Sequence, residues 1–215
     1  KEAYGRESDI IYPPVDCERF AFSNQDDGYY LIVSALVPYK RVDLAVKTFS
    51  NTDRELLVVG SGPELKNLKA LASANVRFIE IADDEDVVEY MRKCSALIFP
   101  GNEDFGIVPV EAQACGKPVI AFGKGGALET VIGLEDSQSA STNATGIFFN
   151  EQSERALLGS VKVFEEKKDS FDAQKCRVNA MRFSRHIYKE KMKKFIENVC
   201  NAEETACAEK TLYWL

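Results

Sequence analysis

Short apolar runs alternate along the chain with stretches whose apolar residues recur at helical spacing. Five runs are expected to be strands buried on both faces: residues 29–36, 55–59, 76–79, 96–99 and 118–122. Each is followed by a helix-forming stretch, and residues 146–149 read as a further strand at the sheet edge. Strands that alternate with helices in this way predict an α/β fold with a Rossmann-like, doubly wound parallel sheet.

The stretch around residues 95–131 is the centre of this pattern. The strand at 96–99 ends at Pro100-Gly101, and a helical pattern begins at Ile107 and closes at Gly116. Gly106 lies directly before that helix, where it lets backbone N–H groups approach a ligand closely. The helix dipole adds roughly 0.3–1 kcal/mol of attraction for an anion there, so this is a candidate phosphate site.

Two glutamates bracket this candidate phosphate site. Glu103 lies in the preceding loop and Glu111 about one turn into the helix. Each carboxylate can accept two hydroxyl hydrogen bonds, which suits neighbouring hydroxyls of a sugar. Paired carboxylates also serve glycoside hydrolases, but a hydrolase has no use for a phosphate site between them.

Polar and glycine-rich segments follow each of the five buried strands, at the edge of the sheet where parallel strands end. They are Lys40, the run G-S-G-P with Gly60 and Gly62, the pair Glu80-Ile81, the loop 103–106 and the run G-K-G-G at 123–126. Ligands of open parallel sheets bind at this edge, so their convergence predicts a site. Gly60-Ser61-Gly62 lacks the third glycine of a dinucleotide fingerprint, and the chain has no P-loop.

The amino-acid composition argues against several classes of function. There are 27 basic and 34 acidic residues, a net charge of −7, which argues against nucleic-acid binding. The six cysteines have no C-x-x-C spacing and only one histidine accompanies them, which argues against zinc and indicates reduced thiols in a cytoplasmic protein. Between Lys175 and Lys194 lie eight basic residues and one acid. We interpret these basic residues as the solvated face of a helix, in preference to a surface that makes peripheral contact with the inner face of an anionic membrane.

The chain divides into four parts. Residues 1–28 are expected to be a linker or tail from a preceding domain, and residues 29–183 the Rossmann-like domain that carries the candidate phosphate and sugar site. Residues 184–200 form an amphipathic helix whose apolar face is Tyr188, Met192, Phe195, Ile196 and Val199. Residues 201–215 lose this pattern and are expected to be a disordered tail.

The motifs together resemble a known family. E-D-F-G-I-V-P-V-E, with seven residues between its glutamates, resembles the E-x7-E signature of retaining family 4 glycosyltransferases of the GT-B fold. Further segments, such as I-I-Y-P-P-V-D, V-V-G-S-G-P-E and C-G-K-P-V-I-A-F-G, fall in family order over about residues 8–200. Within the family the chain is most similar to mannosyltransferases of surface-polysaccharide assembly, which implies GDP-mannose as donor and no metal cofactor.

The resemblance implies a role for each matching residue. Lys40 would contact the donor diphosphate, Gly106 and the amides of Ile107 and Val108 would face phosphate and sugar, Glu103 would orient sugar hydroxyls, and Glu111 would take the ribose hydroxyls. Residues 77–81 would border the base. The candidate donor site is Lys40, Arg41, Gly60, Gly62, Glu80, Ile81, Glu103, Phe105, Gly106, Ile107, Val108 and Glu111, with Glu103 and Lys40 as catalytic residues.

The chain departs from the family's sequence pattern at one point. Many members have G-R-L where this chain has Ser34-Ala35-Leu36, so a second cation is absent, and Arg41 and Lys124 are the candidates to replace it.

A complete enzyme of this type has two Rossmann-like domains, with the glycan or lipid-linked acceptor on the first. The chain matches the donor-binding half, which alone should transfer little. A non-enzymatic nucleotide-sugar sensor remains the alternative.

Overall fold

The computed structural model describes Gly5 and residues 8–134 and 143–212, with side chains up to residue 200. Its strands form one parallel six-stranded sheet in the order β3-β2-β1-β4-β5-β6. The strands are β1 (Tyr30–Val33), β2 (Leu56–Val59), β3 (Val76–Ile79), β4 (Ala96–Phe99), β5 (Val119–Phe122) and β6 (Gly146–Phe149). This is the doubly wound, Rossmann-like order, so the predicted fold class is confirmed.

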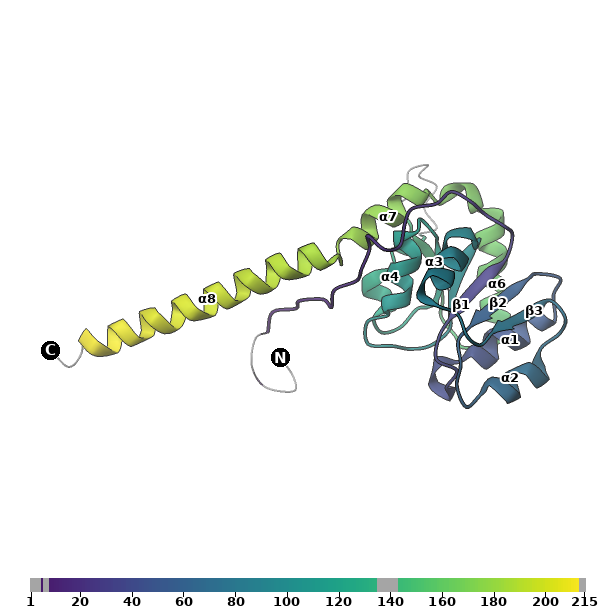
Figure 1. Cartoon of the computed structure of the whole chain (residues 1–215), viewed down its shortest axis with the longest axis horizontal. Coiled ribbons are helices and arrows are strands. Elements are labelled where there is room, and N and C mark those ends of the chain that lie inside the picture. The colour runs from purple at the N-terminus through teal and green to yellow at the C-terminus, as the bar shows by residue number, and fades with distance from the viewer. Residues whose placement is uncertain (1–4, 6–7, 135–142, 213–215) are drawn as a thin grey trace.

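Helices cover both faces of the sheet, as Figure 1 shows. One face carries α3 (Asp84–Lys93), α4 (Ile107–Ala114), α5 (Ala127–Thr130) and α7 (Ala173–Met181). The other carries α1 (Val42–Ser50), α2 (Leu65–Leu71) and α6 (Glu154–Glu166). Two short 3-10 helices, η1 (Pro38–Lys40) and η2 (Lys168–Ser170), complete the body. Because both faces are covered, β1, β2, β4 and β5 consist of apolar residues throughout.

Several boundaries differ from the sequence prediction. β1 ends at Val33, three residues before the predicted end. Leu36 already belongs to the exit loop, where its N–H donates to the carbonyl of Ser61 in the loop after β2. Leu36 is fully buried there, so its apolar character did not distinguish strand from loop. Helix α2 begins at Leu65, which leaves Pro63 in the preceding turn. Residues 135–142 of the loop before β6 lie outside the described part.

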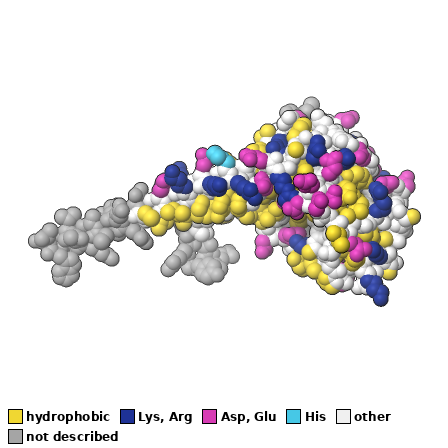
Figure 2. Space-filling model, viewed as in Figure 1, with side chains coloured by type: hydrophobic (Ala, Val, Ile, Leu, Met, Phe, Trp, Pro, Cys, Tyr) yellow, Lys and Arg dark blue, Asp and Glu magenta, His cyan; other side chains and the backbone are white. Residues whose placement is uncertain are grey.

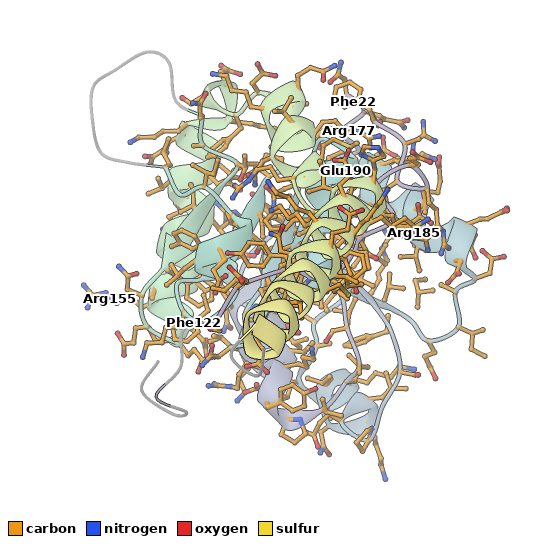
Figure 3. The ribbon with its side chains drawn as sticks, turned by 90° about the vertical axis from the view of Figure 1, so that its left-hand side faces the viewer. Phe22, Phe122, Arg155, Arg177, Arg185 and Glu190 are labelled. Atoms are coloured by element: carbon orange, nitrogen blue, oxygen red, sulfur yellow. The ribbon has the colours of Figure 1, made fainter. Side chains whose placement is uncertain are left out.

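The segment before β1 packs against the domain. The N–H of Val15 bonds the carbonyl of Phe183, and Val15, Cys17 and Phe20 are buried in the core. Arg177 of α7 lies on the same side of the molecule as Phe22 (Figure 3), and it donates to the carbonyls of Phe20 and Ala114. The expected linker, residues 1–28, therefore becomes part of the domain core from Val15 onward.

Helix α8 (Arg185–Leu212) projects from the α/β body (Figure 1). It passes residue 200, where the helix was expected to end, so residues 201–212 are helical in place of the disordered tail; residues 213–215 lie outside the described part. Its predicted apolar face forms a continuous stripe in Figure 2, and Phe195, Ile196 and Val199 are exposed. No helix in the described ranges is long and apolar enough to cross a membrane.

Candidate functional site

Helix α4 is held in place by a buried polar network. The amide of Gln113 donates to the carbonyls of Pro109 and Thr130 at 3.0 and 2.9 Å. Asn179 of α7 donates to Gln113 Oε1 at 2.6 Å and to the Thr130 carbonyl at 2.8 Å. These bonds fix α4 against α5 and α7, so the amino end of α4 has a defined position at the carboxyl edge of the sheet.

The strand order reverses between β1 and β4, and the exit loops of these two strands meet there. A Cβ on Gly101 would lie 3.2 Å from the Cα of Lys40, so the two backbones are in close contact. Lys40 Nζ lies 2.6 Å from Glu103 Oε2, and both side chains are mostly buried. The structure thus brings together the two residues predicted to be catalytic, at the position where doubly wound sheets bind ligands.

Gly106 is the N-cap residue of α4, with φ +84°. A side chain in this left-handed conformation would be strained, and a Cβ would lie 3.2 Å from the ring of Phe99. No side chain caps the helix, so the N–H groups of Ile107 and Val108 remain available at its first turn. Ile107 is exposed and Val108 half-buried.

The loop before Gly106 is supported from two sides. The N–H of Gly126 donates to the Glu103 carbonyl at 2.7 Å, and a Cβ on Gly126 would lie 2.3 Å from the Cα of Phe105. The ring of Phe105 stacks on Tyr12 at 5.7 Å and meets Phe183 edge-on at 5.4 Å. The ring of Phe105 belongs to this aromatic cluster and supports the loop, and the predicted contact of Phe105 with the donor stays a prediction.

Glu111 is a mostly buried carboxylate without a hydrogen bond or ion pair among the described residues. Burial is the main cause that raises its pKa to about 7; Arg19 lowers the pKa and Asp84 raises it. A buried carboxyl group without a partner is costly, and such groups concentrate at functional sites. Arg19 and Asp84 come from elements remote in the sequence, so sequence analysis did not single them out.

The exit loops of β1 and β2 form the floor of an adjacent pocket of about 440 Å³. Its lining comes from five elements and their loops: Val33, Ser34, Ala35, Val59, Gly60, Ser61, Glu80, Ala82, Val87 and Val108. A Cβ on Gly60 would lie 1.9 Å from the carbonyl oxygen of Ser34, and one on Gly62 would lie 2.5 Å from that of Leu36. Both glycines therefore let the two loops pack closely and shape the pocket.

The other residues predicted to bind the donor, and the two candidates for the second cation, differ in their surroundings. Glu80 lines the pocket and pairs with Lys69, whereas the neighbouring Ile81 is 93% exposed. Arg41 pairs with Asp43 at 3.2 Å and donates to Gln152 at 3.2 Å. Lys124 lies over the ring of Phe122 at 5.6 Å. Neither of these two basic residues forms an ion pair with Glu103 in the described structure, so the position of the second cation stays a prediction.

The titratable side chains of the described residues include no group of three or more histidines, cysteines or acids arranged to hold a metal ion. The positive charges that the site presents are those of Lys40 and the amino end of α4.

Several known proteins have related sequences. The sequence profile of the family described as glycosyl transferases group 1 matches residues 18–182. The uncharacterized glycosyltransferase MJ1178 of Methanocaldococcus jannaschii is 32% identical over 180 residues, which are 78% of this chain and 50% of that protein. A GDP-mannose-dependent monoacylated alpha-(1-6)-phosphatidylinositol monomannoside mannosyltransferase of Corynebacterium glutamicum is 38% identical over 114 residues, 46% of this chain and 30% of that protein.

A solved structure has the same fold. HepE of Anabaena, crystallised in complex with UDP and glucose, superimposes with a TM-score of 0.75 at 21% identity over 91% of this chain and 59% of that one. The chain spans about half the length of the first of its curated relatives.

Proposed function

The chain belongs to the glycosyl transferases group 1 family, and from this premise we propose that it is the donor-binding half of a retaining hexosyltransferase. The proposed reaction moves mannose from GDP-mannose to a glycan or lipid-linked acceptor. The observation that carries the proposal is Glu111, a mostly buried carboxylate without a partner, one turn into the helix whose amino end is uncapped.

Glu111 suits a ribose. In its charged form the carboxylate has two acceptor oxygens and no donor, and two adjacent hydroxyls can bind them together. Binding would give the buried charge the hydrogen bonds that the free protein lacks, so part of the cost of burying it is recovered on binding.

Lys40 and the amino end of α4 suit the diphosphate. As the bond between the sugar and the diphosphate breaks, negative charge develops on the departing oxygen, and a fixed cation with free backbone N–H groups stabilises it. In the free protein Lys40 is paired with Glu103 at 2.6 Å. Phosphate oxygens would compete for Lys40, and Glu103 would then accept hydrogen bonds from the sugar hydroxyls.

The choice of donor rests on the relatives and the pocket. The Corynebacterium relative is named as GDP-mannose-dependent, whereas the HepE structure contains UDP. The pocket beside Glu80 has the volume of a small-ligand site, and its polar groups include backbone of the exit loops and the hydroxyls of Ser34 and Ser61. We propose that the base binds there, next to Val108 and Val87.

The acceptor is proposed to bind a second domain. The chain spans half of the length of its relative MJ1178, and the carboxyl edge of the sheet is open in the described structure. We propose a cytoplasmic location for the transfer. We also propose that Lys40 and α4 supply the charge for which other transferases use a divalent ion, so that EDTA should leave nucleotide affinity unchanged.

The test is calorimetric titration of GDP, UDP, ADP and GDP-mannose into the whole chain and into Glu111→Ala. GDP and GDP-mannose should bind most tightly, and Glu111→Ala should weaken both by about tenfold or more, as expected for lost charge-assisted hydrogen bonds worth roughly 1.5–3 kcal/mol. Glu55→Ala is the control, because Glu55 is an exposed carboxylate paired with Arg77 at the start of β2. Equal affinity in Glu111→Ala and the wild type would refute the assignment.

A further inference from the structure

Gln152 links two loops that leave the sheet beside the candidate site. It lies between β6 and α6, and its Nε2 donates to the carbonyl of Pro100 at 2.8 Å. Its Oε1 accepts a hydrogen bond from Nη1 of Arg41 at 3.2 Å. Pro100 begins the exit loop of β4, and Arg41 is the last residue before α1 in the exit loop of β1. One half-buried side chain therefore joins both loops.

Arg41 has an unusual backbone conformation. Its φ is +54°, and among the described residues it is the one non-glycine with a positive φ. A side chain is strained in this left-handed conformation, and such residues concentrate where function depends on local geometry. The conformation closes η1, because the N–H of Arg41 donates to the carbonyl of Pro38 at 3.1 Å, and Arg41 is also the N-cap residue of α1. The backbone of Lys40, the last residue of η1, is held directly before this turn.

The guanidinium of Arg41 is engaged by its neighbours in the free protein. Its Nε lies 3.2 Å from Oδ1 of Asp43 in the first turn of α1, and its Nη1 donates to Gln152. The side chains of Arg41 and Asp43 are 34% and 32% exposed, so the ion pair is partly shielded from solvent, which strengthens it. The side chain of Arg41 therefore connects its own loop to Gln152.

The two joined loops carry the residues predicted to be catalytic. Lys40 directly precedes Arg41, and Glu103 follows Pro100 by three positions. The loop backbones also touch, since a Cβ on Gly101 would lie 3.2 Å from both the Cα and the carbonyl oxygen of Lys40. The position of Lys40 Nζ, 2.6 Å from Glu103 Oε2, therefore depends on how these loops are held against each other.

We propose that Arg41 and Gln152 are positioning residues that hold the exit loops of β1 and β4 together and so place Lys40 for the diphosphate. In this role Arg41 acts through Lys40 and is not the second cation at the phosphates. The proposal rests on the proposed function for the identity of the ligand. Its physical basis is that a cation stabilises developing negative charge most effectively when its position is fixed beforehand.

A double-mutant cycle with Lys40→Ala tests the proposal by calorimetric titration of GDP. Leucine at position 152 is similar in size to glutamine, but it can neither donate to Pro100 nor accept from Arg41. Gln152→Leu should weaken GDP binding about fivefold in the wild type and less than about twofold in Lys40→Ala, because a positioning residue has no effect once the group that it positions is absent. Arg41→Met should show the same pattern. Equal losses in both backgrounds would mean direct contact with GDP or a general distortion, and would overturn the proposal.

Gln174→Leu is the matched control. Gln174 is exposed at the start of α7, and it lines a pocket with Ser95 and Pro118, which precede β4 and β5 at the opposite edge of the sheet. This variant should leave the affinity for GDP unchanged in both backgrounds.

Urea unfolding supplies a readout without ligand. If Gln152 helps to hold Lys40 against Glu103, the double variant Gln152→Leu, Lys40→Ala should lose less stability than the sum of the two single losses. Additive losses of stability would show that Gln152 and Lys40 are not coupled, and would overturn the proposal.

The two proposals fail in different ways. If GDP binds to none of these proteins, the proposed function fails, while the urea cycle still decides whether Gln152 positions Lys40. If GDP binds and depends on Glu111, but the binding cycle is additive, the proposed function stands and the positioning role of Arg41 and Gln152 is refuted.

Discussion

Glu111→Gln should stabilise the protein at pH 8 although it removes the carboxylate that we propose binds the ribose. The pKa of Glu111 is raised from 4.5 to about 7, mainly by burial. Between these two pH values the folded protein binds more protons than the unfolded chain, so this group makes the free energy of unfolding fall as pH rises. Above pH 7 the cost of the buried charge is fully present.

The size of this stability penalty follows from the difference between the pKa values of Glu111 in the unfolded and folded protein. At 1.36 kcal/mol for each pH unit, the upper bound is ~3.4 kcal/mol. The carboxylate retains some contact with water, which reduces the penalty, and we expect about 2 kcal/mol. Glutamine has the same size and no charge, so Glu111→Gln removes this penalty without creating a cavity.

The assay is urea unfolding of the whole chain at pH 5, 6, 7 and 8. Glu111→Gln should differ little from the wild type at pH 5 and should be more stable by about 2 kcal/mol at pH 8. Glu55→Gln, at an exposed carboxylate, should show no such trend. A stability difference between Glu111→Gln and the wild type that is the same at pH 5 and pH 8 would refute the reasoning.

Four further predictions concern the site and the elements that support it. Lys40→Ala should weaken GDP binding about tenfold in calorimetry, because it removes the proposed phosphate contact and leaves Glu103 without Lys40 as its partner. Gly60→Ala should lower the free energy of unfolding by more than about 2 kcal/mol, since its φ is +144° and its Cβ would overlap Ser34. Gly159→Ala, in the interior of α6 with nothing within 4 Å, should raise it by about 0.5–1 kcal/mol. Asn179→Ala should lower the free energy of unfolding by about 1–3 kcal/mol in thermal or urea unfolding, because the buried Oε1 of Gln113 loses its donor and the Thr130 carbonyl loses one of two.

The apolar pattern determined the class of fold. Strands β3 and β4 begin and end where the sequence predicted, because Val76–Ile79 and Ala96–Phe99 are short and bounded by turn residues. The start of α4 was also predicted, since a glycine and a proline in the first turn are local signals. Local signals did not locate the end of β1, because Leu36 is buried in a loop as fully as in a strand.

The pairings within the site were decided by the tertiary structure alone. The sequence placed Lys40 and Glu103 after two strands, but only the order β1-β4 in the sheet makes them neighbours at 2.6 Å. The same holds for Phe105, whose ring packs against Tyr12 and Phe183, two residues that are remote from it in the sequence. Arg19 and Asp84 meet across 65 positions of sequence, and no spacing rule links them. Residue type and period are local properties, whereas the charge state of Glu111 depends on which distant groups the folded chain brings around it.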